Sequence, residues 1–272
     1  MVTKIIAIGC SFTFGYEIDQ PKNNNVSKFL DRTYTGLLAK HFGIDFQIYA
    51  RPGAGNRDIS VVAQEAMYKH RNEDCLYICF WSGTDRASYI INDQKPNSDS
   101  YTISGGLVKY LKQYPEMYPD HPARKNQYMM DLYTMHHGIK QQVYDGLVWF
   151  NGVHNYAKLN NHKLLHIHML RSMDSKLDLF EQQVLPGKNW RTRYTEQGKL
   201  PKALDSSLVN TYSNTKRWFT EKGLLNIIHG EDNVRYRNGD HLNFEGHQRA
   251  SELILERTNI NELINTSINK QG

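Results

Sequence analysis

Four short polar segments of this 272-residue chain combine residue types that could carry out chemistry together. The first three each follow an apolar run that predicts a buried strand, and the fourth precedes the last predicted helix. Because ligands bind outside the carboxyl ends of parallel strands, we expect the segments to converge on one edge of a sheet. They are Gly9-Cys10-Ser11, Gly53-Ala54-Gly55-Asn56, Ser82-Gly83-Thr84-Asp85 and Asn238-Gly239-Asp240-His241.

A serine and a histidine from such segments can catalyse acyl transfer if the fold brings them together. A serine hydroxyl is a weak nucleophile at neutral pH and needs an imidazole within hydrogen-bond reach to take its proton. A third group then holds the imidazole in one tautomer. Backbone amides in glycine-containing turns can stabilise the oxyanion of the tetrahedral intermediate. The residue types therefore favour nucleophilic ester chemistry by Ser11 and His241.

Three stretches resemble sequence blocks of the SGNH (GDSL-like) hydrolases, in the order in which that family has them. Residues 9–13 (Gly-Cys-Ser-Phe-Thr) are similar to the first block. Residues 50–56 (Ala-Arg-Pro-Gly-Ala-Gly-Asn) are similar to the second block, and residues 241–247 (His-Leu-Asn-Phe-Glu-Gly-His) to the fifth. The matches are short, but they are spread over almost the whole chain.

The resemblance implies a role for several residues. Ser11 would be the nucleophile and His241 the general base. The amides of Ser11 and Gly53, with Gly55 as the alternative to Gly53, would hold the oxyanion. No cofactor is implied, and the substrates of the family are small acyl esters, including acetyl groups on carbohydrates, and lipids.

The sequence departs from the family pattern at three places. Cys10 replaces the usual aspartate beside the nucleophile. Thr84 stands where the family has the asparagine that completes the oxyanion hole, so we assign that role to Thr84, with Ser82 as the alternative. Asn238 stands where the family has the triad aspartate, and Asp240 is the nearby carboxylate, so we expect Asp240, or alternatively Asn238, to orient the histidine.

The elements that must position these segments alternate in a βαβ pattern. Such alternation predicts a parallel sheet covered by helices on both faces. We expect one domain, residues 1–272, folded as a three-layer α/β/α sandwich with a flavodoxin-like, mostly parallel five-stranded sheet. Insertions are expected at 86–125 and 171–205, where Asn, Ser, Pro, Gly and charged residues predominate. Strands are predicted at 5–8, 46–50, 75–81 and 162–170, and helices at 34–42, from 56 onward, within 127–159, at 208–219 and at 244–263.

Composition limits the classes of partner. The net charge of +5 comes from scattered residues and does not form the basic stripe of a nucleic-acid binder. The three cysteines cannot all pair, which is typical of buried thiols in a reducing compartment. The apolar stretch near the N-terminus has only about six residues, too few for a signal peptide, and no run approaches a membrane span. These features predict a cytoplasmic protein with no membrane and no nucleic-acid partner.

Three other interpretations are weighed against an ester hydrolase. His136-His137 and His166-Ile167-His168 suggest a metal site, but no cysteine or carboxylate lies at ligand spacing, so no metal is expected. A catalytically weak or inactive SGNH-like binding module would account for the departures from the family pattern. A phosphate or nucleotide binder using residues 9–15 is disfavoured because no lysine ends that loop. The expected partner remains a small-molecule or glycan ester with a short acyl group.

Overall fold

The computed structural model of the chain describes residues 1–16, 18, 26–83, 86–90, 100–104, 139–170, 206–220, 222–232, 235–238 and 241–266. The elements in chain order are β1 (Lys4–Gly9), α1 (Ser11–Phe14), η1 (Val26–Arg32), α2 (Tyr34–Phe42), β2 (Asp45–Ala50), α3 (Asn56–Lys69), β3 (Cys75–Trp81), β4 (Arg86–Ile90), β5 (Ser100–Ser104), α7 (Ile139–Leu159), β6 (Lys163–His168), α10 (Ser206–Asn214), α11 (Leu224–Asp232), β7 (Arg237–Asn238), β8 (His241–Leu242), α12 (Phe244–Arg257) and α13 (Ile260–Asn265).

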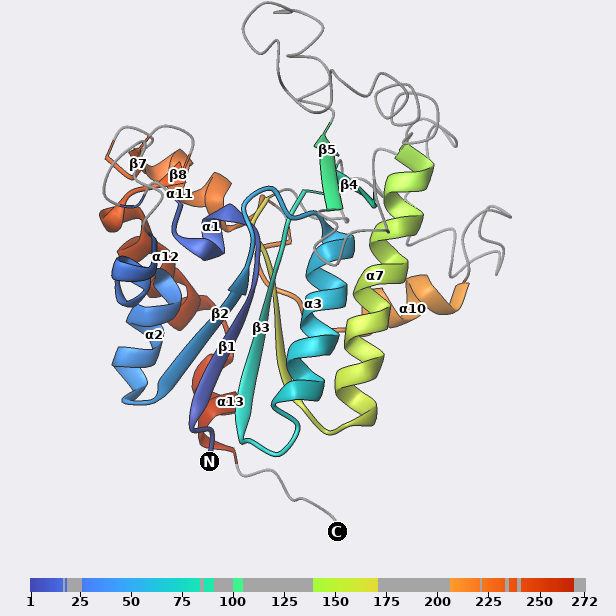
Figure 1. The fold of residues 1–272 in the computed structure, drawn as a ribbon, viewed down its shortest axis with the longest axis horizontal. Helices are drawn as coiled ribbons and strands as arrows, with labels where there is room; N and C mark the ends of the chain where they lie inside the picture. The colour runs from blue at the N-terminus through green and yellow to red at the C-terminus, as the bar shows by residue number, and fades with distance from the viewer. Residues whose placement is uncertain are drawn as a thin grey trace, which may run out of the picture.

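A parallel sheet with strand order β2-β1-β3-β6 forms the middle layer. Helices α2 and α12 lie on one side of it, and α3 and α7 pack together on the other (Figure 1). The predicted three-layer α/β/α fold with a mostly parallel sheet is therefore confirmed. Strand β3 is buried along its whole length, as its uninterrupted apolar run predicted.

The two faces of the sheet differ in polarity. The face toward α2 and α12 carries aliphatic and aromatic side chains such as Ile5, Ile78 and Ile167, all fully buried. Each such aliphatic side chain contributes roughly 1.5–3 kcal/mol when removed from water. The face toward α3 and α7 also holds polar side chains, among them Tyr77 and His166. All three cysteines are buried and free, as predicted.

The sheet has four described strands, not the five that were expected. At the position of a fifth strand, a single parallel bridge joins Trp218 to Ile167 of β6. The amide of Trp218 donates to the His166 carbonyl at 3.1 Å, and the amide of His168 donates to the Trp218 carbonyl at 3.1 Å. The helix predicted over 208–219 ends at Asn214, because the chain must straighten to reach this edge.

Three other regions add to or differ from what the sequence predicted. The insertion expected at 86–125 includes an antiparallel hairpin, β4 with β5, in its described part. The last predicted helix is interrupted: Thr258 is extended and its hydroxyl donates to the Ile254 carbonyl at 2.7 Å, so α12 and α13 are separate. The apolar stretch 224–228 forms the start of helix α11. The insertion at 171–205 and residues 105–138 lie outside the described part of the chain.

None of the helices in the described ranges is long and apolar enough to cross a membrane.

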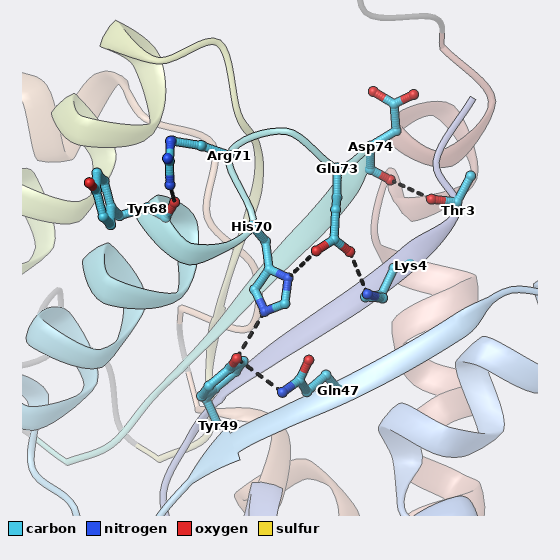
Figure 2. Close-up of polar contacts among 9 residues, drawn as sticks. All are labelled: Thr3, Lys4, Gln47, Tyr49, Tyr68, His70, Arg71, Glu73 and Asp74. Carbon is cyan, nitrogen blue, oxygen red and sulfur yellow. Dashed lines mark hydrogen bonds and ion pairs between the residues drawn. The ribbon is translucent and has the colours of Figure 1, made fainter.

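A chain of polar contacts links β2 to the segment after α3 and to the start of β1 (Figure 2). Gln47 donates to the Tyr49 hydroxyl at 3.0 Å, and that hydroxyl lies 2.8 Å from Nε2 of His70. Nδ1 of His70 lies 2.6 Å from Glu73, whose carboxylate also pairs with Lys4. The ion pair raises the pKa of Lys4 and lowers that of Glu73. The network connects edge strand β2 to β1 through the end of α3.

The Tyr49 hydroxyl is the link that a single substitution removes most cleanly. We expect Tyr49→Phe to lower the free energy of unfolding by about 1–2 kcal/mol, because Gln47 and His70 each lose a hydrogen-bond partner. Urea denaturation measures the change. Tyr68→Phe is the matched control, since Tyr68 is 61% exposed. Equal effects of the two substitutions would contradict a structural role for the network.

Candidate active site

Ser11 lies in a tight turn at the carboxyl end of β1. The strand ends at Gly9, and Ser11 begins the short helix α1, with the amides of Thr13 and Phe14 both donating to the Cys10 carbonyl. A side chain does not fit at Gly9, because a Cβ there would lie 2.0 Å from Oγ1 of Thr13. The turn therefore holds Ser11, which is 6% exposed, in one place at the edge of the sheet.

His241 meets Ser11 from the far end of the sequence. Its Nε2 lies 2.9 Å from Oγ of Ser11, a hydrogen bond between residues 230 positions apart. His241 stands in β8 just before α12, whose first turn is capped by Asn243 through a 2.9 Å bond from the amide of Gly246. The rings of Phe12 and Tyr16 flank the imidazole, with centroids 4.9 and 5.0 Å away. The structure thus brings together the predicted nucleophile and base.

A buried network lies beneath this pair and was not predicted. The Tyr34 hydroxyl donates to Oγ1 of Thr13 at 2.7 Å, and the Tyr34 amide donates to Nδ1 of His247 at 3.3 Å. The three residues are at most 1% exposed. They connect α1, which begins at Ser11, to α2 and α12. The sequence predicted α2 and α12 but not α1, and no local signal indicates that these side chains meet.

Burial sets the ionisation of the network. It lowers the pKa of His247 to about 3, with a smaller contribution from the nearby His241, so the His247 imidazole is neutral at neutral pH. A neutral Nδ1 can accept the Tyr34 amide proton, whereas an imidazolium could not. Burial also raises the pKa of the Tyr34 phenol well above its usual value. The α1–α2–α12 junction is therefore held by uncharged hydrogen bonds.

The second polar segment begins beside the Ser11 turn. The amide of Arg51 donates to the Gly9 carbonyl at 3.3 Å. Gly53 has a positive φ of 79°, a conformation that favours glycine, and its amide has no acceptor among the described residues. The Gly55 amide instead donates to the Asp58 carboxylate at 3.1 Å. The Gly55 amide, the alternative to that of Gly53 as an oxyanion donor, therefore already has an acceptor within the protein.

The third segment is described as far as Gly83. The amide of Ser82 donates to Oδ1 of Asn56 at 2.8 Å, a bond between the end of β3 and the first residue of α3. Both residues are buried. Oγ of Ser82 is buried without a partner among the described residues, so it does not open to a ligand there.

Two predicted site residues, Thr84 and Asp240, lie outside the described residues. Asn238, the alternative to Asp240, pairs with His241 through the backbone of β7 and β8. The identity of the third group that orients His241 therefore stays a prediction, as does the side-chain contribution of Thr84.

A cavity of about 530 Å³ lies between edge strand β2 and α3. Its lining includes Gly9 and Ala54, which belong to the first two polar segments, and aliphatic residues such as Ile59. Arg51 and Asp58 also line it and form an ion pair at 3.1 Å. The cavity combines an apolar lining with charged groups beside the Ser11 turn.

The histidines that suggested a metal site are placed as follows. His136-His137 lie outside the described residues. His166 and His168 are buried on β6, and Nδ1 of His166 accepts the Trp81 indole proton at 3.0 Å. Burial lowers the pKa of His166 well below its usual value. His166 is therefore a buried side chain whose Nδ1 already has a hydrogen-bond partner within the protein.

A different group, at the opposite end of the sheet, brings three potential metal ligands together. The ligand atoms of His70, Glu73 and Cys75 lie within 4.8 Å of one another. Both ring nitrogens of His70 are already hydrogen-bonded, and Glu73 pairs with Lys4 (Figure 2). Burial raises the pKa of Cys75 to about 11, which disfavours the thiolate that a metal needs. The group fits a structural network better than a metal centre.

The architecture agrees with the three-layer α/β/α fold that the sequence predicted. Four parallel strands in the order β2-β1-β3-β6 lie between helices, with Ser11 directly after β1 and His241 directly before α12. No family model matches the chain, and no curated protein matches it.

Solved structures of low similarity were found. A lipase from a goat rumen metagenome shares 12% identity and a TM-score of 0.43, over 94% of this chain and 97% of that chain. A protein from Desulfitobacterium hafniense DCB-2, described as a putative lipolytic protein of the G-D-S-L family, shares 18% identity and a TM-score of 0.25. The match covers 60% of this chain and 77% of that chain. A carbohydrate esterase, whose active site is described as having divergent catalytic and non-catalytic binding functions, shares 15% identity and a TM-score of 0.33. The match covers 78% of this chain and 69% of that chain. At these sequence identities and TM-scores, the similarity assigns no role to any residue of this chain.

The neutral His247 makes the stability of the site depend on pH. Its pKa is about 3 in the folded chain and about 6.5 in an unfolded chain, so protons bind preferentially to the unfolded state between these values. The contribution is complete above pH 6.5 and is lost as the pH falls toward 3, at about 1.4 kcal/mol per pH unit.

The comparison of the wild type with His247→Asn isolates this contribution. Urea denaturation between pH 8 and about 4.5 should give the wild type a steeper fall in the free energy of unfolding below pH 6.5. His41→Gln, a change at an exposed histidine, should leave the slope as it is in the wild type. Parallel curves for wild type and His247→Asn would show that His247 is not buried in the neutral form.

Proposed function

We propose that the protein hydrolyses carboxylic esters, with Ser11 as the nucleophile and His241 as the general base. The observation that carries the proposal is the 2.9 Å contact between Oγ of Ser11 and Nε2 of His241. This distance lies within the range required for proton transfer between a nucleophile and its base. The position of the pair at the carboxyl edge of a parallel sheet also supports it.

In the first half of the reaction, Oγ of Ser11 attacks the ester carbonyl carbon while Nε2 of His241 takes the hydroxyl proton. The carbonyl oxygen becomes an oxyanion, which the amides of Ser11 and Gly53 stabilise, with Thr84 as a further donor. The tetrahedral intermediate then collapses. The bond to the alkoxide oxygen breaks, the alcohol leaves with the proton from His241, and the acyl group stays on Ser11.

In the second half, water replaces the alcohol. His241 takes a proton from the water as its oxygen attacks the acyl carbon, and the same amides hold the second oxyanion. Collapse returns the proton to Oγ of Ser11 and releases the carboxylic acid. Because Nε2 must accept a proton, Nδ1 carries one and needs an acceptor, and we assign this role to Asp240, with Asn238 as the alternative.

We further propose a short acyl group on a polar carrier, such as acetyl on a carbohydrate. Low apolar content in the segments 86–125 and 171–205 supports this choice, because a long acyl chain needs an apolar channel. p-Nitrophenyl acetate should therefore be turned over with a higher kcat/KM than p-nitrophenyl octanoate. The reverse order would contradict the assignment of a short acyl group without affecting that of Ser11.

The roles of Ser11 and His241 are tested by a fluorophosphonate probe and p-nitrophenyl acetate. The wild type should be labelled and should hydrolyse the ester. Ser11→Ala should abolish labelling and lower kcat by at least about 1,000-fold, since the nucleophile is lost. His241→Gln should lower kcat to a similar extent, because the hydroxyl loses its base.

Two substitutions serve as controls. Ser251→Ala removes a buried hydroxyl on α12, and His41→Gln changes an exposed histidine. Both should retain wild-type labelling and turnover. Turnover that survives Ser11→Ala would rule out Ser11 as the nucleophile. A wild type inert toward probe and ester would favour the ligand-binding module.

A further inference from the structure

We infer that Asn56 supplies the side-chain donor of the oxyanion hole, the position for which the sequence suggested Thr84. The inference rests on the proposed function and names a further catalytic residue of the same site. It is carried by the bond between Asn56 and Ser82, by the strand register, and by the exposure of one amide nitrogen. The sequence predicted a helix from residue 56 onward, and Asn56 is indeed the first residue of α3.

The strand register places Asn56 beside the nucleophile. Ile8 of β1 pairs with Cys79 of β3. Ser11 follows Ile8 by three residues, and Ser82 follows Cys79 by three residues, so the two serines leave neighbouring parallel strands at the same level. The side chain of Asn56 is bonded to the Ser82 amide and therefore lies at this level, at the end of β3, the strand next to that of Ser11.

The same bond fixes which way the amide of Asn56 is turned. The Ser82 amide is a donor, so the atom of Asn56 that faces it must be the oxygen, at 2.8 Å. The planar group then directs Nδ2 away from Ser82. Nδ2 has no hydrogen-bond partner among the described residues, yet it is not one of the buried unpartnered atoms. Although Asn56 is only 7% exposed, its donor nitrogen is not sealed from solvent.

An oriented, unpaired N–H of this kind suits a developing negative charge. It needs no reorganisation when the ester carbonyl becomes an oxyanion, because the Ser82 bond already holds it. Asn56 also begins a 14-residue helix, and the partial positive charge of a helix N-terminus adds to the stabilisation. The buried hydroxyl of Ser82 cannot act in this way, so within this pair the donor is Asn56.

Asn56→Asp separates donation from structure. An aspartate keeps an oxygen for the Ser82 amide but replaces the donor with a second carboxylate oxygen. With p-nitrophenyl acetate we expect kcat to fall by about 100- to 1,000-fold at neutral pH, with KM and Tm close to the wild type. As the pH falls and the carboxylate gains a proton, its O–H can donate, so the ratio of variant to wild-type kcat should rise. Asn160→Asp, on an exposed asparagine, is the matched control.

The outcomes distinguish this inference from the proposed function. If the wild type is active, Ser11→Ala is inactive and Asn56→Asp retains kcat within a few-fold, the inference is overturned and the proposed function stands. If Asn56→Asp fails to fold, Asn56→Ala carries the test, and an unchanged kcat in that variant likewise overturns the inference. A wild type without esterase activity overturns both.

Discussion

The close approach of Thr13 to Gly9 is the constraint from which the rest of the candidate site follows. There is no room for a Cβ at Gly9, so the chain turns sharply out of β1 and presents Ser11 at the edge of the sheet. Thr13 is in turn held by Tyr34, and Tyr34 by His247 on α12. Because His241 immediately precedes α12, one buried network positions both members of the pair. The network therefore links the elements that carry two residues 230 positions apart.

The sheet separates this site from a second polar region. At the carboxyl edge, Oγ of Ser11 is held by His241, and Nδ2 of Asn56 has no partner among the described residues, so a ligand can use it. Toward the amino edge, the Tyr49 hydroxyl, both ring nitrogens of His70 and the Glu73 carboxylate are all hydrogen-bonded to protein groups (Figure 2). Polar groups satisfied by the protein stabilise the fold, whereas oriented and unpaired ones are available for chemistry. This difference, more than residue type, distinguishes the two ends.

The sequence predicted what depends on local pattern. The β-branched run before Gly9 and the continuous apolar run of β3 predicted the central strands, and helical spacing predicted α2 and α3. It failed where tertiary contacts decide. The expected fifth strand is a single bridge at Trp218, which no periodicity signals. The contact of Asn56 with Ser82 joins residues 26 positions apart, and the spacing of an asparagine after a glycine turn indicates only a helix start. The third group of the triad is still a prediction.

The central claim is that an acyl group passes through Ser11. Mass spectrometry of protein quenched during turnover of p-nitrophenyl acetate tests it most directly. The account predicts an acetyl group on the peptide that contains Ser11, present during turnover and lost once substrate is exhausted. Steady hydrolysis with no acetyl group on that peptide, or with acetyl on another residue that tracks turnover, would contradict it.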